Sequence, residues 1–211
     1  MKQVPFYSNT SDNTHCLQAA LRIVLKYYCP DKEYTWEELE KFTAKKEGLW
    51  TWGMQGLINM QKLGFDVIVR EDFDSQQFIE KGEEYLKEKF GKEVAREQIK
   101  HSDIDQEREI AKEYVKLFGT KGIPASLDEL KSLLDSDYLI IANVNSKALN
   151  NKEGYVGHFV VIYNYDDTYL YLHDPGLPPQ EARKVSFVQF LKAWEYPDED
   201  AKGIMAFTLK S

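Results

Sequence analysis

The apolar positions in the first third of the chain recur at helical spacing. Over residues 16–28 they fall three and four positions apart, which predicts an amphipathic helix that Pro30 terminates. The same spacing predicts short helices over residues 36–42 and 54–63. Residues 65–70 then indicate a strand. The chain therefore begins with a helical half.

The pattern changes to strands in the last third of the chain. A near-continuous apolar run over 138–144 is typical of a strand that is buried on both faces. Further elements are a short helix capped by Ser126, a hairpin around Asp166-Asp167, and a final helix and strand over 186–194 and 204–209. Helices first and a mostly antiparallel sheet second predict an α+β fold in one domain over residues 1–211.

Residues 71–121 have a different character. Positions 71–120 hold 14 acidic and 9 basic residues, so they carry −5 of the net charge of −8. The apolar residues in this stretch keep helical spacing, which predicts two or three solvated helices inserted into the domain. The alternative is a regulatory or partner-binding surface.

The composition excludes several classes of protein. Hydrophobic residues make up 43% of the 211 residues, which a disordered chain does not reach. A net charge of −8, without a basic cluster, argues against nucleic acid as a partner and against binding to an anionic membrane surface. No apolar run reaches the length of a membrane span or resembles a secretion signal, so we expect a cytoplasmic protein. We also expect no cofactor.

The two cysteines, Cys16 and Cys29, lie at opposite ends of the first predicted helix. Thirteen residues of helix separate them by about 20 Å, too far for a disulfide. Cys16 lies where unpaired N–H groups and the helix dipole favour a reactive thiolate. The alternative for Cys16 is a small buried apolar side chain. Cys29, at the carboxyl end beside Pro30, is interpreted as structural.

A thiol nucleophile needs a base, and four histidines are available. His158 begins an apolar strand and is the best placed, although a purely structural role at a strand end is the alternative. His15 adjoins Cys16, but neighbouring helical side chains point about 100° apart. His101 lies in the polar stretch, where we expect it to be exposed. His173 closes the partner strand of the hairpin.

Four segments together resemble a known family. They are Val4-Pro5-Phe6-Tyr7-Ser8-Asn9, Cys16-Leu17-Gln18-Ala19-Ala20-Leu21, Gly157-His158-Phe159-Val160-Val161-Ile162-Tyr163 and His173-Asp174-Pro175-Gly176. Their order resembles the papain-like cysteine peptidases, in particular the bacteriocin-processing, double-glycine leader peptidase type. The resemblance covers residues 4–70 and 123–209 and implies the papain-like fold, with 71–121 as an insertion.

The resemblance implies a role for four residues. Cys16 is the nucleophile, His158 the general base and acid, and Asp174 the group that orients the imidazole. Asn9 matches the position from which the family supplies a glutamine side chain to the oxyanion hole, and Asn is one methylene shorter. Leu17 stands where the family usually has glycine.

The resemblance also places a turn with three large side chains beside the substrate groove. Trp50, Trp52 and Met54 would then line the cleft, and the alternative is that they are ordinary core residues. Trp194 and Tyr196 are interpreted as packing residues.

The hairpin offers an internal test of the implied triad. Side chains alternate between the faces of a strand, so a regular two-residue turn at Asp166-Asp167 would put His158 and Asp174 on opposite faces. A loop of odd length, or a bulge, would put them on the same face. We expect one of these two irregularities.

Three functions remain open at this point. The first is a cysteine hydrolase or acyl-transferase acting on peptide or amide bonds. The second is a catalytically weak binding or regulatory module that uses the 71–121 helices as its interaction surface. The third is a metal site of Cys16, His158 and Asp174, with His15 as a further ligand, but no short ligand spacing supports it. We therefore expect no metal.

Overall fold

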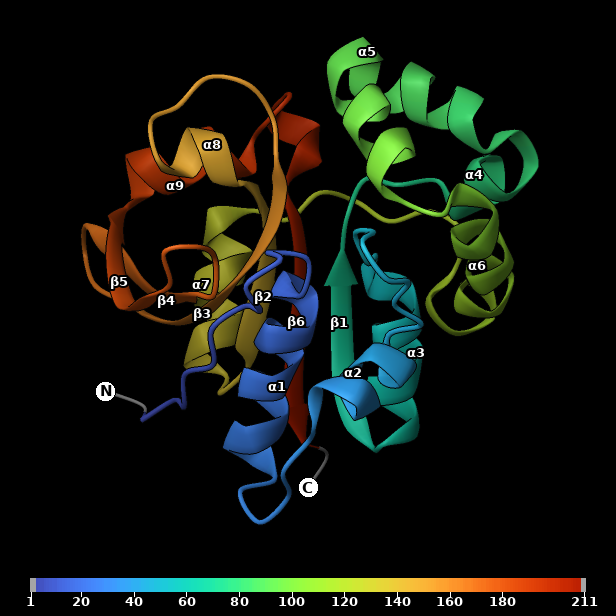
Figure 1. Ribbon diagram of the computed structural model, residues 1–211. Coiled ribbons are helices and arrows are strands. Elements are labelled where there is room, and N and C mark those ends of the chain that lie inside the picture. The colour runs from blue at the N-terminus through green and yellow to red at the C-terminus, as the bar shows by residue number, and fades with distance from the viewer. Residues whose placement is uncertain (1–2, 210–211) are drawn as a thin grey trace.

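Six strands form a single antiparallel sheet in the order β1-β6-β2-β3-β4-β5 in the computed structural model, which describes residues 3–209 (Figure 1). All five pairings are antiparallel. The last strand, β6, lies between β1 and β2 and so joins the helical half to the sheet. The strands are β1 (Phe65–Arg70), β2 (Leu139–Asn145), β3 (Gly157–Tyr165), β4 (Tyr169–Asp174), β5 (Gln180–Ser186) and β6 (Gly203–Leu209).

The helices confirm the α+β order. The first spans the sixteenth to the twenty-eighth residue, as the spacing predicts, and three helices fill the predicted acidic stretch. The helices are α1 (Cys16–Tyr28), α2 (Trp36–Phe42), α3 (Gly53–Lys62), α4 (Ser75–Lys81), α5 (Glu83–His101), α6 (Ile104–Phe118), α7 (Leu127–Asp135), α8 (Ser146–Leu149) and α9 (Phe187–Trp194), with a 3₁₀ turn at Glu199–Ala201.

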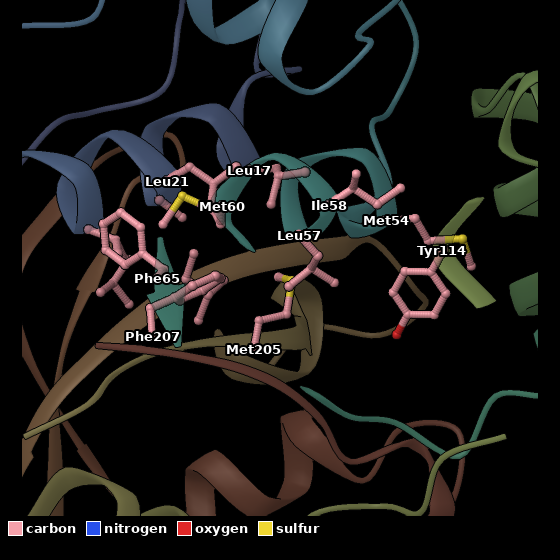
Figure 2. Packing of buried hydrophobic residues seen from close by; sticks show 14 of the residues in the cluster. Leu17, Leu21, Met54, Leu57, Ile58, Met60, Phe65, Tyr114, Met205 and Phe207 are labelled. Atoms are coloured by element: carbon pink, nitrogen blue, oxygen red, sulfur yellow. The ribbon is translucent and has the colours of Figure 1, made fainter. Parts of the chain in front are cut away.

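The sheet separates two apolar cores, because side chains alternate between its faces. In β2, Leu139 and Ile141 pack with α1, α3 and the helices α4–α6. The residues between and after them, Ile140 and Ala142, pack with α7, α8 and α9 on the other face. Figure 2 shows the first core, where Leu17 and Leu21 of α1 and residues of α3 meet Phe65 and Phe207 of the sheet. The result is a layer of helices on each side of the sheet.

Helix starts and one edge strand show where local sequence reasoning succeeds and where it fails. The capping box of Thr35 and Glu38 is present as the sequence indicates. Asn13 and Thr14 are the caps that the sequence predicts for α1, because short polar side chains accept from the free N–H groups of a helix start. This prediction is wrong: the cap residue is His15, and its N–H donates to Asn9 Oδ1 at 2.8 Å. The strand β5 was not predicted, because its sequence is polar and it lies at the edge of the sheet.

The helices α4–α6, residues 75–118, are called the helical segment below. Its apolar side chains belong to the same core as α1 and α3. Trp52 stacks on Phe78 of α4 with ring centroids 5.0 Å apart, and Trp52 Nε1 donates to Ser102 Oγ at 3.0 Å. Figure 1 shows the segment as a group of green helices beside the end of β1. It therefore adjoins the turn that leads into α3.

Candidate active site

Cys16 is the first residue of α1 and is half-buried. The backbone N–H groups of Leu17 and Phe159 act on its sulfur and help to lower the pKa of the thiol. The first belongs to the free N–H groups of the helix terminus, and the second lies next to His158 on β3. Cys29 is also free and caps the other end of α1. The two thiols thus occupy the opposite environments that the sequence predicts.

His158 and Asp174 contact each other directly. His158 Nε2 lies 2.7 Å from Asp174 Oδ1, and both side chains are buried. The β3–β4 hairpin itself has a short turn in which Asp166 N donates to Tyr169 O at 2.9 Å. A bulge between Ile162 and Asn164 then shifts the register by one residue. This is the irregularity that the parity argument requires, because beyond it both side chains point to one face.

Asp174 contacts only one nitrogen of the His158 imidazole. Asp174 engages Nε2, so Nδ1 is the nitrogen available to hydrogen-bond the Cys16 sulfur. Burial alone would raise the pKa of Cys16, but the hydrogen bond to His158 and its charge outweigh burial and lower it. Burial alone would lower the pKa of His158, but its bonds to Asp174 and Cys16 raise it to about 10. Both shifts favour the thiolate–imidazolium pair.

Asp174 is held on both of its oxygens. Oδ1 accepts from His158 and from the backbone N–H of Gly176 at 3.0 Å. Oδ2 accepts from Arg183 Nη1 at 2.7 Å, while Arg183 Nη2 donates to Leu149 O at 2.9 Å. Burial would raise the pKa of Asp174, but these donors, His158 first, lower it to about 2. The carboxylate therefore stays ionised and fixed.

Asn9 lies buried beside the start of α1. Its Oδ1 accepts from the backbone N–H groups of Thr10 and His15, at 2.9 and 2.8 Å. Its Nδ2 donates to Asn13 Oδ1 at 3.0 Å, and Asn13 lines the cavity next to Cys16. Asn9 therefore supports the loop that precedes the thiol. Its role as an oxyanion donor remains a prediction.

A cavity of about 210 Å³ adjoins the thiol and the imidazole. Trp50, Trp52 and Met54 all line it together with Cys16 and His158. The cavity exceeds the roughly 150 Å³ that can enclose a benzene ring. Met54 and Trp52 also pack in the core, and a role of the three side chains in binding a substrate remains a prediction.

The remaining histidines have structural contacts. His15 lies between Glu40 and Thr10, with ring nitrogens 2.7 Å from Glu40 Oε1 and 2.6 Å from Thr10 Oγ1. The expectation that His101 is exposed is wrong: it is half-buried and stacks on Trp50 with centroids 4.9 Å apart. His173 is buried and bonds Val4 O at 3.0 Å.

Three residues near the site were missed or misread from the sequence. Tyr196 was interpreted as a packing residue, yet it lines the cavity, where it stacks on Tyr155. Arg183, which holds Asp174, lies on the unpredicted strand β5. Glu71 lines the cavity at the end of β1, and nothing in an acidic stretch singles out one glutamate. Only the fold brings these residues to the site.

Among residues 3–209, no helix is both long and apolar enough to cross a membrane. Within the same residues, no group of three or more His, Cys, Asp or Glu side chains is arranged to hold a metal ion.

The fold defines the class of protein. It is the papain-like fold of the C39 peptidases, since two solved structures superpose over 99% of the chain. One is a double glycine motif protease from an AMS/PCAT transporter, in complex with the leader peptide, at 12% identity and a TM-score of 0.51 over 94% of that chain. The other is the peptidase domain of Streptococcus ComA, a bifunctional ABC transporter involved in quorum sensing, at 13% identity and a TM-score of 0.53 over 100% of that chain.

The sequence itself gives the family. Residues 1–201 match the Peptidase_C39 like family, so the chain belongs to this family of cysteine peptidases. A search of curated proteins gave no significant match.

Proposed function

We propose that this chain is a cysteine hydrolase that cleaves peptide or amide bonds through Cys16, His158 and Asp174. The observation that carries the proposal is the continuous line of contacts from thiol to imidazole to carboxylate, with 2.7 Å between His158 Nε2 and Asp174 Oδ1. The pKa of Cys16 is lowered, that of His158 is raised and that of Asp174 is lowered, each in the direction that its role requires. A peptide substrate is supported by the relative that was solved with a leader peptide.

The chemistry follows from this arrangement. The Cys16 thiolate attacks the carbonyl carbon, and the carbonyl electrons move to the oxygen. When the intermediate collapses, the C–N bond breaks, a thioester remains, and His158 gives its Nδ1 proton to the leaving amine. His158 then takes a proton from water, which attacks the thioester and releases the acid and the thiolate. An amine in place of water would give acyl transfer.

The oxyanion is the charge that the site must stabilise. The backbone N–H of Cys16 lies at the amino end of α1, where the helix leaves such groups unpaired. We propose that the second donor comes from the Asn9–Asn13 pair, with Asn9 as the residue that the family pattern favours. The Asn9 Nδ2 bond fixes the amide against Asn13, which lines the cavity with Cys16.

We propose that residues 71–121 form a helical insertion within a single papain-like domain, and that this insertion forms one wall of the substrate cleft. Trp50 N donates to His101 O at 2.6 Å, so the insertion is tied to the cleft turn. Phe90, Val94 and Gln98 of α5 line the same cavity as Cys16. This placement favours a role in substrate binding over a separate interaction surface.

A hydrolysis assay tests the proposal. A mixture of peptides of diverse sequence is incubated with the protein, and new termini are identified by mass spectrometry. We expect cleavage by the wild-type chain and by Cys29→Ala, and none by Cys16→Ala or His158→Ala. Cys29→Ala is a matched control because it removes the other free, half-buried thiol. Equal cleavage by Cys16→Ala would contradict the proposal, and absence of any cleavage would favour a binding module.

A further inference from the structure

The wall of the cavity at the end of β1 carries an unpaired negative charge. Glu71 follows β1 directly, its side chain is exposed, and it lines the cavity. Among residues 3–209, its carboxylate has no hydrogen bond or ion pair. The ammonium of Lys89, whose charge acts on Glu71, is already bonded to Asp72 Oδ2. A substrate group could therefore meet Glu71 without displacing a protein partner.

The surroundings of Glu71 are aromatic. Tyr114 of α6 and Tyr155, before β3, line the same cavity, and the charge of Glu71 adds to burial in raising the pKa of both phenols. Tyr196 stacks on Tyr155 with centroids 5.8 Å apart. Aromatic faces bind the methylenes and the charged head of long basic side chains.

The charge balance of the cavity is also negative. Asp200 lines it with a carboxylate that is unpaired among the described residues. The one Arg or Lys in the described lining, Arg70, donates to Glu129 Oε1 at 2.7 Å and is thus neutralised. The groups packed around the cavity partly desolvate Glu71, although solvent still reaches its side chain, and this raises its pKa to about 7, with Lys89 opposing and Asp72 adding to the rise. The carboxylate is therefore mostly ionised at about pH 8.

We propose that this part of the cavity is a subsite for a basic side chain, lysine or arginine, of a peptide substrate. The cationic head binds Glu71 and the methylenes lie along Tyr114 and Tyr155. The inference rests on the proposed function, since it needs a substrate that reaches Cys16. The subsite makes Glu71 a specificity-determining residue. Glu71 follows β1, and the helical segment contributes Tyr114 to the same cavity.

Affinity labels test the subsite without knowledge of the natural substrate. Chloroacetamides with alkyl tails of graded length end either in a guanidinium or in a urea of the same shape. In each, the Cys16 thiolate forms a C–S bond to the methylene carbon and chloride leaves. Saturation kinetics separate the binding constant KI from the rate of alkylation. At about pH 8 we expect KI to be roughly tenfold lower for the guanidinium tail, or about 1.4 kcal/mol.

Three variants show whether Glu71 causes the difference. Glu71→Gln should raise KI of the guanidinium tail to that of the urea tail, and Glu71→Lys should instead favour tails that end in a carboxylate. Glu47→Gln, an exposed glutamate outside the cavity lining, should keep the wild-type preference. Melting curves establish that each variant is folded.

The outcomes separate this inference from the function on which it rests. Saturable, His158-dependent labelling with equal KI for the two tails would overturn the subsite alone. Slow labelling that does not saturate and is unchanged in His158→Ala would overturn the proposed function and the subsite together.

Discussion

Arg183 Nη1 donates to Asp174 Oδ2 at 2.7 Å, on the oxygen that His158 does not use. The same guanidinium reaches Leu149 O, so one side chain of the edge strand β5 fixes the carboxylate against the end of α8. Arg183 does not touch the thiol and is a positioning residue. Its effect on the reaction passes through Asp174 and then through the imidazole.

Arg183→Met should weaken the site more than the fold. It leaves Asp174 Oδ2 buried without its donor, which costs about 1–3 kcal/mol. Arg183 is one of the donors that lower the pKa of Asp174, so its loss raises that pKa. We expect kcat to fall about tenfold or more, and the acid limb of the kcat profile to move to higher pH.

Lys184→Met is the matched control for Arg183. It is the next residue on β5, pairs with the exposed Asp166 at 3.5 Å, and lies over the rings of Tyr169 and Tyr171. Its activity profile should match the wild type. An Arg183→Met variant that is less stable but has an unchanged pH profile would limit Arg183 to a structural role.

Asn9→Asp separates the two possible functions of Asn9. The carboxylate keeps an acceptor for the N–H groups of Thr10 and His15, but it loses the Nδ2 donor to Asn13. If the Asn9–Asn13 pair supplies an oxyanion donor, kcat should fall by about 10²–10³ while the melting temperature changes little. Asn9→Ala should lose both activity and stability. Full activity in Asn9→Asp would show that Asn9 only supports the loop.

His173 should make the fold sensitive to acid. Its Nδ1 accepts from Ala182 N at 3.1 Å, so the neutral ring carries its proton on Nε2, which donates to Val4 O at 3.0 Å. Burial lowers the pKa of His173, so the unfolded chain takes up a proton first as pH falls. The free energy of unfolding should therefore decrease as pH falls below about 6.5.

Urea unfolding measured across that range checks the effect of His173. His173→Gln cannot titrate, and it should show a smaller decrease in the free energy of unfolding between neutral and mildly acid pH. His158 contributes with the opposite sign: its pKa is raised to about 10, so its stabilisation is present below about 6.5 and is lost as pH rises towards 10. Identical pH slopes in the wild type and His173→Gln would contradict the assignment.

Much of the fold follows from periodicity. The sequence predicts the first helix to its last residue, because the spacing of its apolar residues defines the helix and Pro30 terminates it. The cap of that helix is not predictable, because the residue that bonds His15 N is Asn9, six positions away in a loop. The edge strand β5 has no apolar signal, since only one of its residues is buried.

The residues of the site also differ in whether the sequence predicts them. The sequence predicts Cys16 from its place at a helix start, and it predicts His158 and Asp174 from the resemblance together with strand parity. The bulge that lets the last two meet was expected as one of two irregularities. The sequence alone does not assign Glu71 and Tyr196 to the cavity, because their positions there depend on how the helical segment and the chain after α9 pack.

The central claim is that His158 keeps Cys16 as a thiolate at neutral pH, and the pH dependence of Cys16 alkylation by iodoacetamide tests it most directly. The claim predicts that Cys16 is alkylated rapidly at a lower pH than an ordinary thiol, because its contacts with His158 outweigh burial and lower its pKa. Cys29 provides the internal reference, read by peptide mapping. In His158→Ala, alkylation of Cys16 should become slow at neutral pH and rise only as ordinary thiols ionise. Equal rates at Cys16 and Cys29 in the wild type, or no change in His158→Ala, would contradict the claim.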